Sequence, residues 1–175
     1  LAGTGSVLSR DVSENKCALI RGNVERMHMP GVTVEVHDAT LPDPALTDTA
    51  DVLYCDLPCS GLGIIGRKCD IKYAVSSESL NSVTELQKKI LQSVWNYVKP
   101  GGIMMYSTCT IHKAENEKMV QWICANLPFE TVSMEDTLPE VLAGQDTVKN
   151  GYLQLLPGQF GTDGFFLSKL RRKEE

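Results

Sequence analysis

Two cysteines, Cys59 and Cys109, lie where a predicted strand has just ended. Polar residues and glycines surround both, whereas Cys17, Cys55 and Cys124 suit the role of small buried hydrophobes. A cysteine is a nucleophile only as its thiolate, and a free thiol with a pKa of about 8.5 is little ionised at neutral pH. The two cysteines therefore predict a site of thiol chemistry whose surroundings lower the pKa of a thiol.

Three of the predicted strands end in an acid, at Asp11, Asp38 and Asp56. Open α/β sheets bind ligands at the carboxyl ends of their strands, and an acid there can accept hydrogen bonds from ribose hydroxyls. Aspartate is also a common capping residue in turns between strands and helices, so each one alone is more often a cap than a ligand. Three acids at equivalent strand ends favour a ligand site.

The elements that must position these residues alternate between strand and helix, which is typical of an α/β domain with a largely parallel sheet. Ser13 is expected to cap a first helix, Ser82 and Glu85 to form the capping box of a second, and Pro100 to end that second helix. A long loop at 60–79 precedes the second helix, and such loops are often functional. The predicted strands lie at 7–11, 32–36, 52–55, 103–107 and 165–170, with short ones near 129–134 and 152–155.

The charge of the chain argues against strong RNA binding by the chain itself. It has 17 Lys and Arg against 22 Asp and Glu, a formal net charge of −5. Because binding to nucleic acid depends on neutralising phosphates, most of any RNA affinity is expected to come from outside this chain. One local basic group is formed by Arg67, Lys68 and Lys72, for which a solvated surface is the simpler interpretation.

Length and cysteine content predict a single cytoplasmic domain spanning residues 1–175. The chain has 175 residues, is 42% hydrophobic, and has no apolar stretch near the roughly 18 residues of a membrane helix. Its six cysteines occur without secretory features, which favours reduced thiols over disulfides. Structural zinc is disfavoured because Cys55, Cys59 and Cys69 form no Cys-x-x-Cys pair, so we expect no metal.

Four motifs together resemble a known family. They are Asp-Leu-Pro-Cys-Ser-Gly at 56–61, Asp-Ile-Lys-Tyr at 70–73, Ser-Thr-Cys-Thr at 107–110 and Gly-Thr-Asp-Gly-Phe-Phe at 161–166. Their order and spacing are similar to those of the Sun/RsmB-type RNA cytosine-C5 methyltransferases, and the resemblance covers nearly the whole chain, from Asp11 to Arg171. It implies a Rossmann-like methyltransferase fold, with a mostly parallel sheet and helices on both faces.

The resemblance also implies roles for the site residues. Cys109 would be the nucleophile and Cys59 would help to release the methylated base. Asp11, Asp38 and Asp56 would line the site of the cofactor, S-adenosylmethionine. Asp56 is also a candidate to hydrogen-bond the amine and ring nitrogen of cytosine. Lys72 is a candidate to contact the RNA substrate and to stabilise the thiolate, although a lone lysine on a loop is more often solvated.

The chemistry agrees with these roles. Carbon 5 of cytosine is too weak a nucleophile to accept a methyl group unaided, but addition of a thiolate to carbon 6 turns the ring into an enamine whose carbon 5 can attack. A base must then remove the proton from carbon 5 so that the thiolate is expelled. Chemistry alone does not decide whether Cys59 or Cys109 attacks.

One departure from the family concerns the start of the chain. The glycine-rich motif that cradles the cofactor, with its strand, would lie just before Leu1, as would the RNA-binding domain of the bacterial relatives. We therefore expect the 175 residues alone to bind S-adenosylmethionine weakly or not at all, and to be inactive.

Small-subunit ribosomal RNA is the expected substrate. A tRNA-directed relative and a non-catalytic fragment are the alternatives. Methylation of an exocyclic amine is disfavoured, because such enzymes typically have Asn/Asp-Pro-Pro-Tyr/Phe where this chain has Asp-Leu-Pro-Cys.

Overall fold

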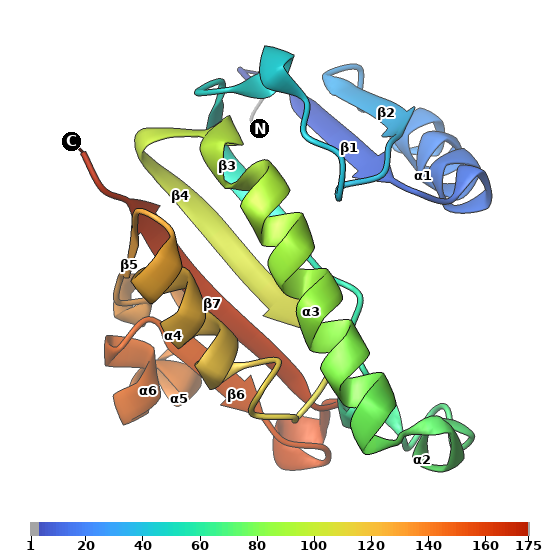
Figure 1. The fold of residues 1–175 in the computed structure, drawn as a ribbon, viewed down its shortest axis with the longest axis vertical. Helices are drawn as coiled ribbons and strands as arrows, with labels where there is room; N and C mark the ends of the chain where they lie inside the picture. Colours follow the sequence, from blue (N-terminus) through green and yellow to red (C-terminus); the bar gives the residue numbers. More distant parts are fainter. Residues whose placement is uncertain (1–3, 175) are drawn as a thin grey trace. The chain divides into compact units, whose positions relative to one another are not determined.

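A computed structural model of the chain describes residues 4–174, which divide into two compact units on either side of Pro42 (Figure 1). The first unit contains β1 (Val7–Asp11), α1 (Glu14–Arg26) and β2 (Val32–Val36). The two strands are parallel and pair along their whole length. The Ser13 hydroxyl accepts the Lys16 N–H at the start of α1, so the predicted N-cap is confirmed.

The second unit is built on a five-stranded sheet with the order β3-β4-β7-β5, in which β6 also pairs with β7. Its strands are β3 (Ala50–Asp56), β4 (Val98–Thr108), β5 (Phe129–Thr131), β6 (Tyr152–Leu155) and β7 (Phe165–Arg172). Its helices are α2 (Ile71–Ala74), α3 (Ser77–Val94), α4 (Glu117–Asn126), α5 (Glu140–Ala143) and α6 (Asp146–Lys149), and short 3₁₀ turns occur at Pro44–Leu46, Leu62–Ile64, Trp95–Tyr97, Glu135–Thr137 and Gln159–Gly161.

The α/β fold class is confirmed, but the sheet of the second unit is mixed where the sequence predicted a mostly parallel one. β3 and β4 are parallel, whereas β7 is antiparallel to β4, β5 and β6. β7 follows β6 after a short connection, and a connection too short for a crossover joins only antiparallel strands. The parallel pair that carries the cysteine motifs is unaffected by this difference.

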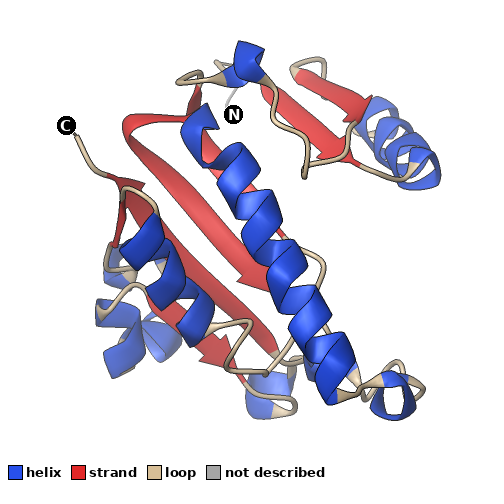
Figure 2. Ribbon diagram, in the orientation of Figure 1, coloured by secondary structure: helices blue, strands red, loops and turns tan. Residues whose placement is uncertain are grey.

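The main core of the second unit lies between the sheet and the helices α3 and α4. Figure 2 shows both helices in front of the same face of the sheet. Tyr106 and Phe166 are fully buried on neighbouring strands, and their rings meet edge to face with centroids 6.2 Å apart. Because packing of large side chains holds the carboxyl ends of β3 and β4 in place, this core positions the residues that follow those strands.

Two predicted boundaries on the path to the site are wrong. α3 begins at Ser77, not near Ser82, because Ser76 and Ser79 form the capping box. Pro100 and the glycines after it lie within β4 as an irregularity of the strand pairing, and do not precede it. Gly101 has a φ of +75°, a conformation that L residues other than glycine rarely adopt.

Within residues 4–174, no helix is both long and apolar enough to cross a membrane.

Candidate active site

The structure brings Cys59 and Cys109 together at the carboxyl ends of two adjacent parallel strands. Cys109 directly follows β4, and Cys59 lies three residues beyond β3. Asp56 pairs with Ser107 across these strands, so the two chains leave the sheet side by side. The two sulfur atoms are 3.0 Å apart and both cysteines are partly buried. Both cysteines follow the end of a strand, as the sequence predicted.

The two thiols share a proton, and the sharing favours a thiolate on Cys109. The hydrogen bond from the Cys59 thiol lowers the pKa of Cys109 to about 7, although burial and the charges of Asp56 and Glu115 oppose this. The same hydrogen bond, together with burial, raises the pKa of Cys59 well above its usual range. The main help for the Cys109 thiolate therefore comes from Cys59, where the sequence had suggested Lys72.

Asp56 lies beside the cysteines, at the end of β3. Its side chain is exposed, and its Oδ1 accepts a hydrogen bond of 3.1 Å from the hydroxyl of Ser107. The other carboxylate oxygen has no described hydrogen bond within residues 4–174, which leaves an acceptor at the strand end. This geometry suits a carboxylate that receives hydrogen bonds from a base or a cofactor.

Close backbone contacts explain why glycines stand at positions 63 and 164. A Cβ on Gly63 would lie 2.2 Å from the carbonyl oxygen of Gly164 and 2.8 Å from that of Cys109. The Gly63 N–H donates to the Cys109 carbonyl, and the Gly164 N–H donates to the Gly63 carbonyl. The motifs at 107–110 and 161–166 therefore meet at Gly63, two residues after the motif at 56–61.

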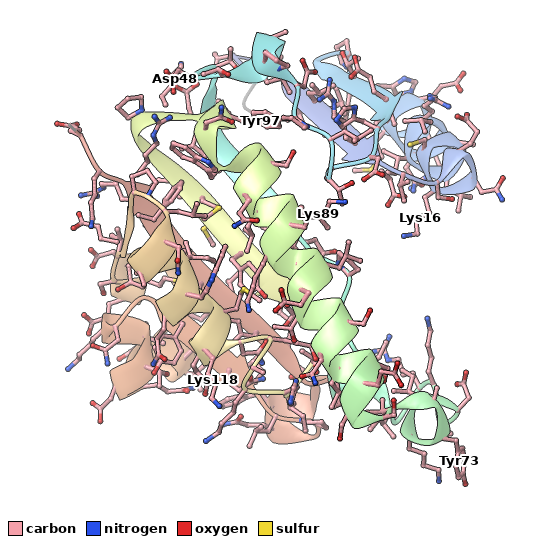
Figure 3. All side chains as sticks on the ribbon, in the orientation of Figure 1. Lys16, Asp48, Tyr73, Lys89, Tyr97 and Lys118 are labelled. Atoms are coloured by element: carbon pink, nitrogen blue, oxygen red, sulfur yellow. The ribbon has the colours of Figure 1, made fainter. Side chains whose placement is uncertain are left out.

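Lys72 lies on the exposed side of α2, where its ammonium is 4.8 Å from the centre of the Tyr73 ring. The Tyr73 side chain extends outward from α2 (Figure 3). The opposite side of α2 packs on the Cys59 segment, because the Ile71 side chain touches Gly61. Ile71 also lines a pocket of about 180 Å³ that Ser60 shares. Lys72 is thus close to the site in the fold, and its contact with RNA stays a prediction.

Asp11 and Asp38 belong to the first unit, where both also hold local turns. Asp11 accepts hydrogen bonds from the Ser13 N–H and the Lys16 ammonium, and Asp38 accepts two from Thr40. Both lie at the same carboxyl edge of the parallel pair β1–β2. Two carboxylates at such an edge can accept hydrogen bonds from the ribose hydroxyls of a nucleoside cofactor, which is compatible with S-adenosylmethionine.

Sequence reasoning missed a buried polar network beneath the thiols. Its members from α3, β4 and the segment after β4 are all fully buried. They are Gln87, Tyr106, Thr108, Glu115 and Asn116. Thr108 donates to Asn116, and Tyr106 donates to the Glu115 carbonyl. Thr108 belongs to the motif at 107–110, but no local pattern in the sequence marked Gln87, Glu115 or Asn116 as buried.

No group of three or more histidine, cysteine, aspartate or glutamate side chains within residues 4–174 is arranged to hold a metal ion.

Solved structures identify the class of fold as that of the Rossmann-like, S-adenosylmethionine-dependent methyltransferases. A methyltransferase homolog protein from Pyrococcus horikoshii is 27% identical with a TM-score of 0.73, over 96% of this chain and 53% of that one. The protein PH0851, whose crystal structure is known, shares 28% sequence identity with this chain and matches it with a TM-score of 0.83. The match covers 98% of this chain and 37% of the PH0851 chain.

The chain belongs to the 16S rRNA methyltransferase RsmB/F family, whose model matches residues 1–171. A probable ribosomal RNA small subunit methyltransferase B from Bacillus subtilis is 37% identical over 97% of this chain. Ribosomal RNA small subunit methyltransferase F from Pectobacterium carotovorum is 28% identical over 98% of it. The chain spans 38% and 36% of the lengths of these two relatives.

Proposed function

We propose that this chain carries the catalytic cysteines of an enzyme that methylates carbon 5 of a cytosine in small-subunit ribosomal RNA. The observation that carries the proposal is the pair of sulfurs 3.0 Å apart, with the pKa of Cys109 lowered to about 7. A pKa near neutrality provides a substantial thiolate fraction, and the most effective attacking thiol has a pKa near the ambient pH. Membership of a family of rRNA methyltransferases supports the substrate class.

The reaction begins with Cys109. Its thiolate adds to carbon 6 of cytosine, a new S–C bond forms, and the electron pair of the ring double bond moves to make carbon 5 nucleophilic. Asp56, exposed beside the thiols, would orient the base by accepting a hydrogen bond from its exocyclic amine. After methylation a base takes the proton from carbon 5. The electron pair of that C–H bond restores the double bond and expels the Cys109 thiolate, and Cys59 assists this release.

S-adenosylmethionine, when bound, supplies the methyl group from its sulfonium centre. Asp11 and Asp38 would hold its ribose hydroxyls, since both carboxylates lie at the carboxyl edge of β1 and β2. These assignments follow the family resemblance and the hydrogen-bond acceptors that the two carboxylates offer.

The RNA affinity of the enzyme would reside mostly outside this chain, whose formal net charge is −5. The local basic group offers little, because Arg67 forms an ion pair with Asp163 at 2.8 Å. Lys68 and Lys72 remain exposed for contact with a phosphate. Named relatives that act on small-subunit rRNA favour that RNA over tRNA.

The test uses the full-length protein, a small-subunit rRNA transcript and labelled S-adenosylmethionine. Cys109→Ser should lower methylation about a thousandfold or more, because a hydroxyl is a far weaker nucleophile. Cys59→Ala should permit attack but stall release, so a covalent protein–RNA adduct should accumulate as a gel shift that survives denaturation. Bisulfite mapping of the product should show one protected cytosine.

Cys69→Ser is the matched control, because Cys69 is exposed and free. It should methylate normally. An adduct that accumulates with the Cys109 variant would reverse the roles of the two cysteines. Full activity of both the Cys59 and the Cys109 variants would disprove the mechanism.

A further inference from the structure

Glu115 is a fully buried carboxylate to which the mechanism above gives no task. It lies between β4 and α4, and its side chain is 0% exposed. Burying a charged group is costly unless hydrogen bonds compensate for the lost water. The position of its hydrogen-bond donors therefore indicates what the carboxylate does.

One carboxylate oxygen of Glu115 holds the Cys59 segment. Its Oε2 accepts the backbone N–H of Ser60 at 2.8 Å and the side-chain amide of Gln87 at 3.3 Å. The same Gln87 amide donates to the carbonyl of Pro58 at 2.8 Å. Glu115 therefore holds Ser60, which follows Cys59. Gln87, which donates to Glu115, holds Pro58, which precedes Cys59.

The other carboxylate oxygen reaches the Cys109 segment. Glu115 Oε1 lies 3.2 Å from Nδ1 of His112, three residues after Cys109. A second link, between the hydroxyls of Ser60 and Thr110 at 2.8 Å, runs in parallel. Glu115 is therefore the buried centre of a bridge between the two cysteine segments.

The effect of the Glu115 charge on the pKa of Cys109 shows whether Glu115 activates the thiol or only positions it. The titratable or charged groups that act on Cys109 are Cys59, Asp56 and Glu115, and His112 faces Glu115. The charge of Glu115 raises the pKa of Cys109 and so opposes formation of the thiolate. A carboxylate that disfavours the reactive form contributes through the geometry that it imposes.

We propose that Glu115 is a positioning residue which, with Gln87, holds the two cysteine segments so that their sulfurs stay in contact. The inference rests on the proposed function for its catalytic consequence, but the geometric claim stands without it. A displacement of about 1 Å within such a site costs on the order of a hundredfold in rate, which is reason enough to bury a carboxylate there.

The first test measures the contact of the sulfurs without RNA or cofactor. In a glutathione buffer, the two thiols and oxidised glutathione exchange for a protein disulfide and two molecules of reduced glutathione, and the equilibrium gives the effective concentration of one thiol for the other. We expect Glu115→Ala to lower this concentration about tenfold to a hundredfold. Glu115→Gln should retain it within about threefold, because one amide oxygen can still accept from Ser60 and Gln87.

The second test uses activity of the full-length protein. Glu115→Ala should lower kcat about tenfold to a hundredfold with little change in KM for RNA. Glu115→Gln should keep most of kcat and shift the acidic limb of the pH profile to lower pH, because the charge that raises the Cys109 pKa is gone. A purely structural role would lower the melting temperature and leave kcat of the folded variants unchanged.

The Gln87→Met variant tests the same inference if the Glu115→Ala variant does not fold. It removes the amide that holds Pro58 but leaves the carboxylate with Ser60 and His112, and it should also lower the effective concentration. Glu85→Gln on the exposed side of α3 is the control and should change nothing. Folded Glu115→Ala and Gln87→Met variants with wild-type effective concentration would overturn the inference. An inactive wild type with the expected thiol equilibria would refute the proposed function alone.

Discussion

The cysteine pair behaves as one titrating unit, because each sulfur defines the state of the other. Cys59 donates to the Cys109 sulfur and in return accepts the Cys109 backbone N–H at 3.3 Å. The hydrogen bond with Cys59 is the largest cause of the lowered pKa of Cys109. Removal of either sulfur should change the acidity of the one that remains.

Alkylation measures this acidity residue by residue. The reaction of Cys109 with iodoacetamide should rise with pH through a midpoint near 7, because only the thiolate reacts and its pKa is about 7. In Cys59→Ala the Cys109 midpoint should move to higher pH, since the hydrogen bond that lowers it is lost. Peptide mass spectrometry reports each rate, and an unmoved midpoint in that variant would rule out the shared proton.

The sequence was sufficient to select both thiols and Asp56, since motif and strand end coincide there. It was not sufficient to select Glu115 or Gln87. Their partners lie 55 and 29 residues away in the chain, and only the packing of α3 and α4 on the sheet brings them under the thiols. Residues whose role depends on such distant contacts carry no local pattern.

At the scale of elements, two serine-based capping patterns lie near the start of α3, and only the first caps the helix. Ser82 and Glu85 match a capping box, yet the N-cap is Ser76, six residues earlier, and the helix begins at Ser77. There the Ser76 hydroxyl accepts the Ser79 N–H at 3.1 Å, and the Ser79 hydroxyl accepts the Ser76 N–H at 2.8 Å. The earlier start places the first turns of α3 beside α2 and the pocket next to Ser60.

Two substitutions distinguish the two caps. Ser76→Ala removes the acceptor for a helical N–H and should lower the free energy of unfolding by about 1 kcal/mol. Ser82→Ala should change it by less than about 0.5 kcal/mol, because Ser82 is exposed within the helix. Urea denaturation of both variants measures the difference. Equal losses, or a larger loss for Ser82→Ala, would contradict the observed helix start.

Two further errors of the sequence prediction concern the start of β4 and the direction of β7, and both arise because a local pattern does not define strand pairing. The sequence Pro-Gly-Gly usually ends an element, but here Gly101 absorbs a positive φ and β4 continues on both sides of it. The direction of β7 was likewise hidden, since a strand pattern is the same in either direction. Pairing partners, which only the folded chain defines, decided both cases.

At the scale of the whole molecule, buried apolar side chains are very unevenly shared. Within residues 4–42, Cys17 is the only buried apolar residue that the structure describes. The second unit contains the large buried side chains, among them Tyr106, Phe166 and Leu170. Since burial of apolar area is the main favourable term in folding, the two units should differ widely in stability.

Hydrogen exchange of the 175-residue chain should reveal this difference directly. Amides of β1, α1 and β2 open without exposing a large core, so they should exchange much faster than those of β4 and β7. Cys17→Ser should accelerate exchange in the first unit and leave β4 unchanged, because its side chain is buried on that unit's own sheet. Mass spectrometry of peptic peptides resolves both units in one experiment. Protection of β1 equal to that of β4 would mean that the first unit is stabilised by more than its own core.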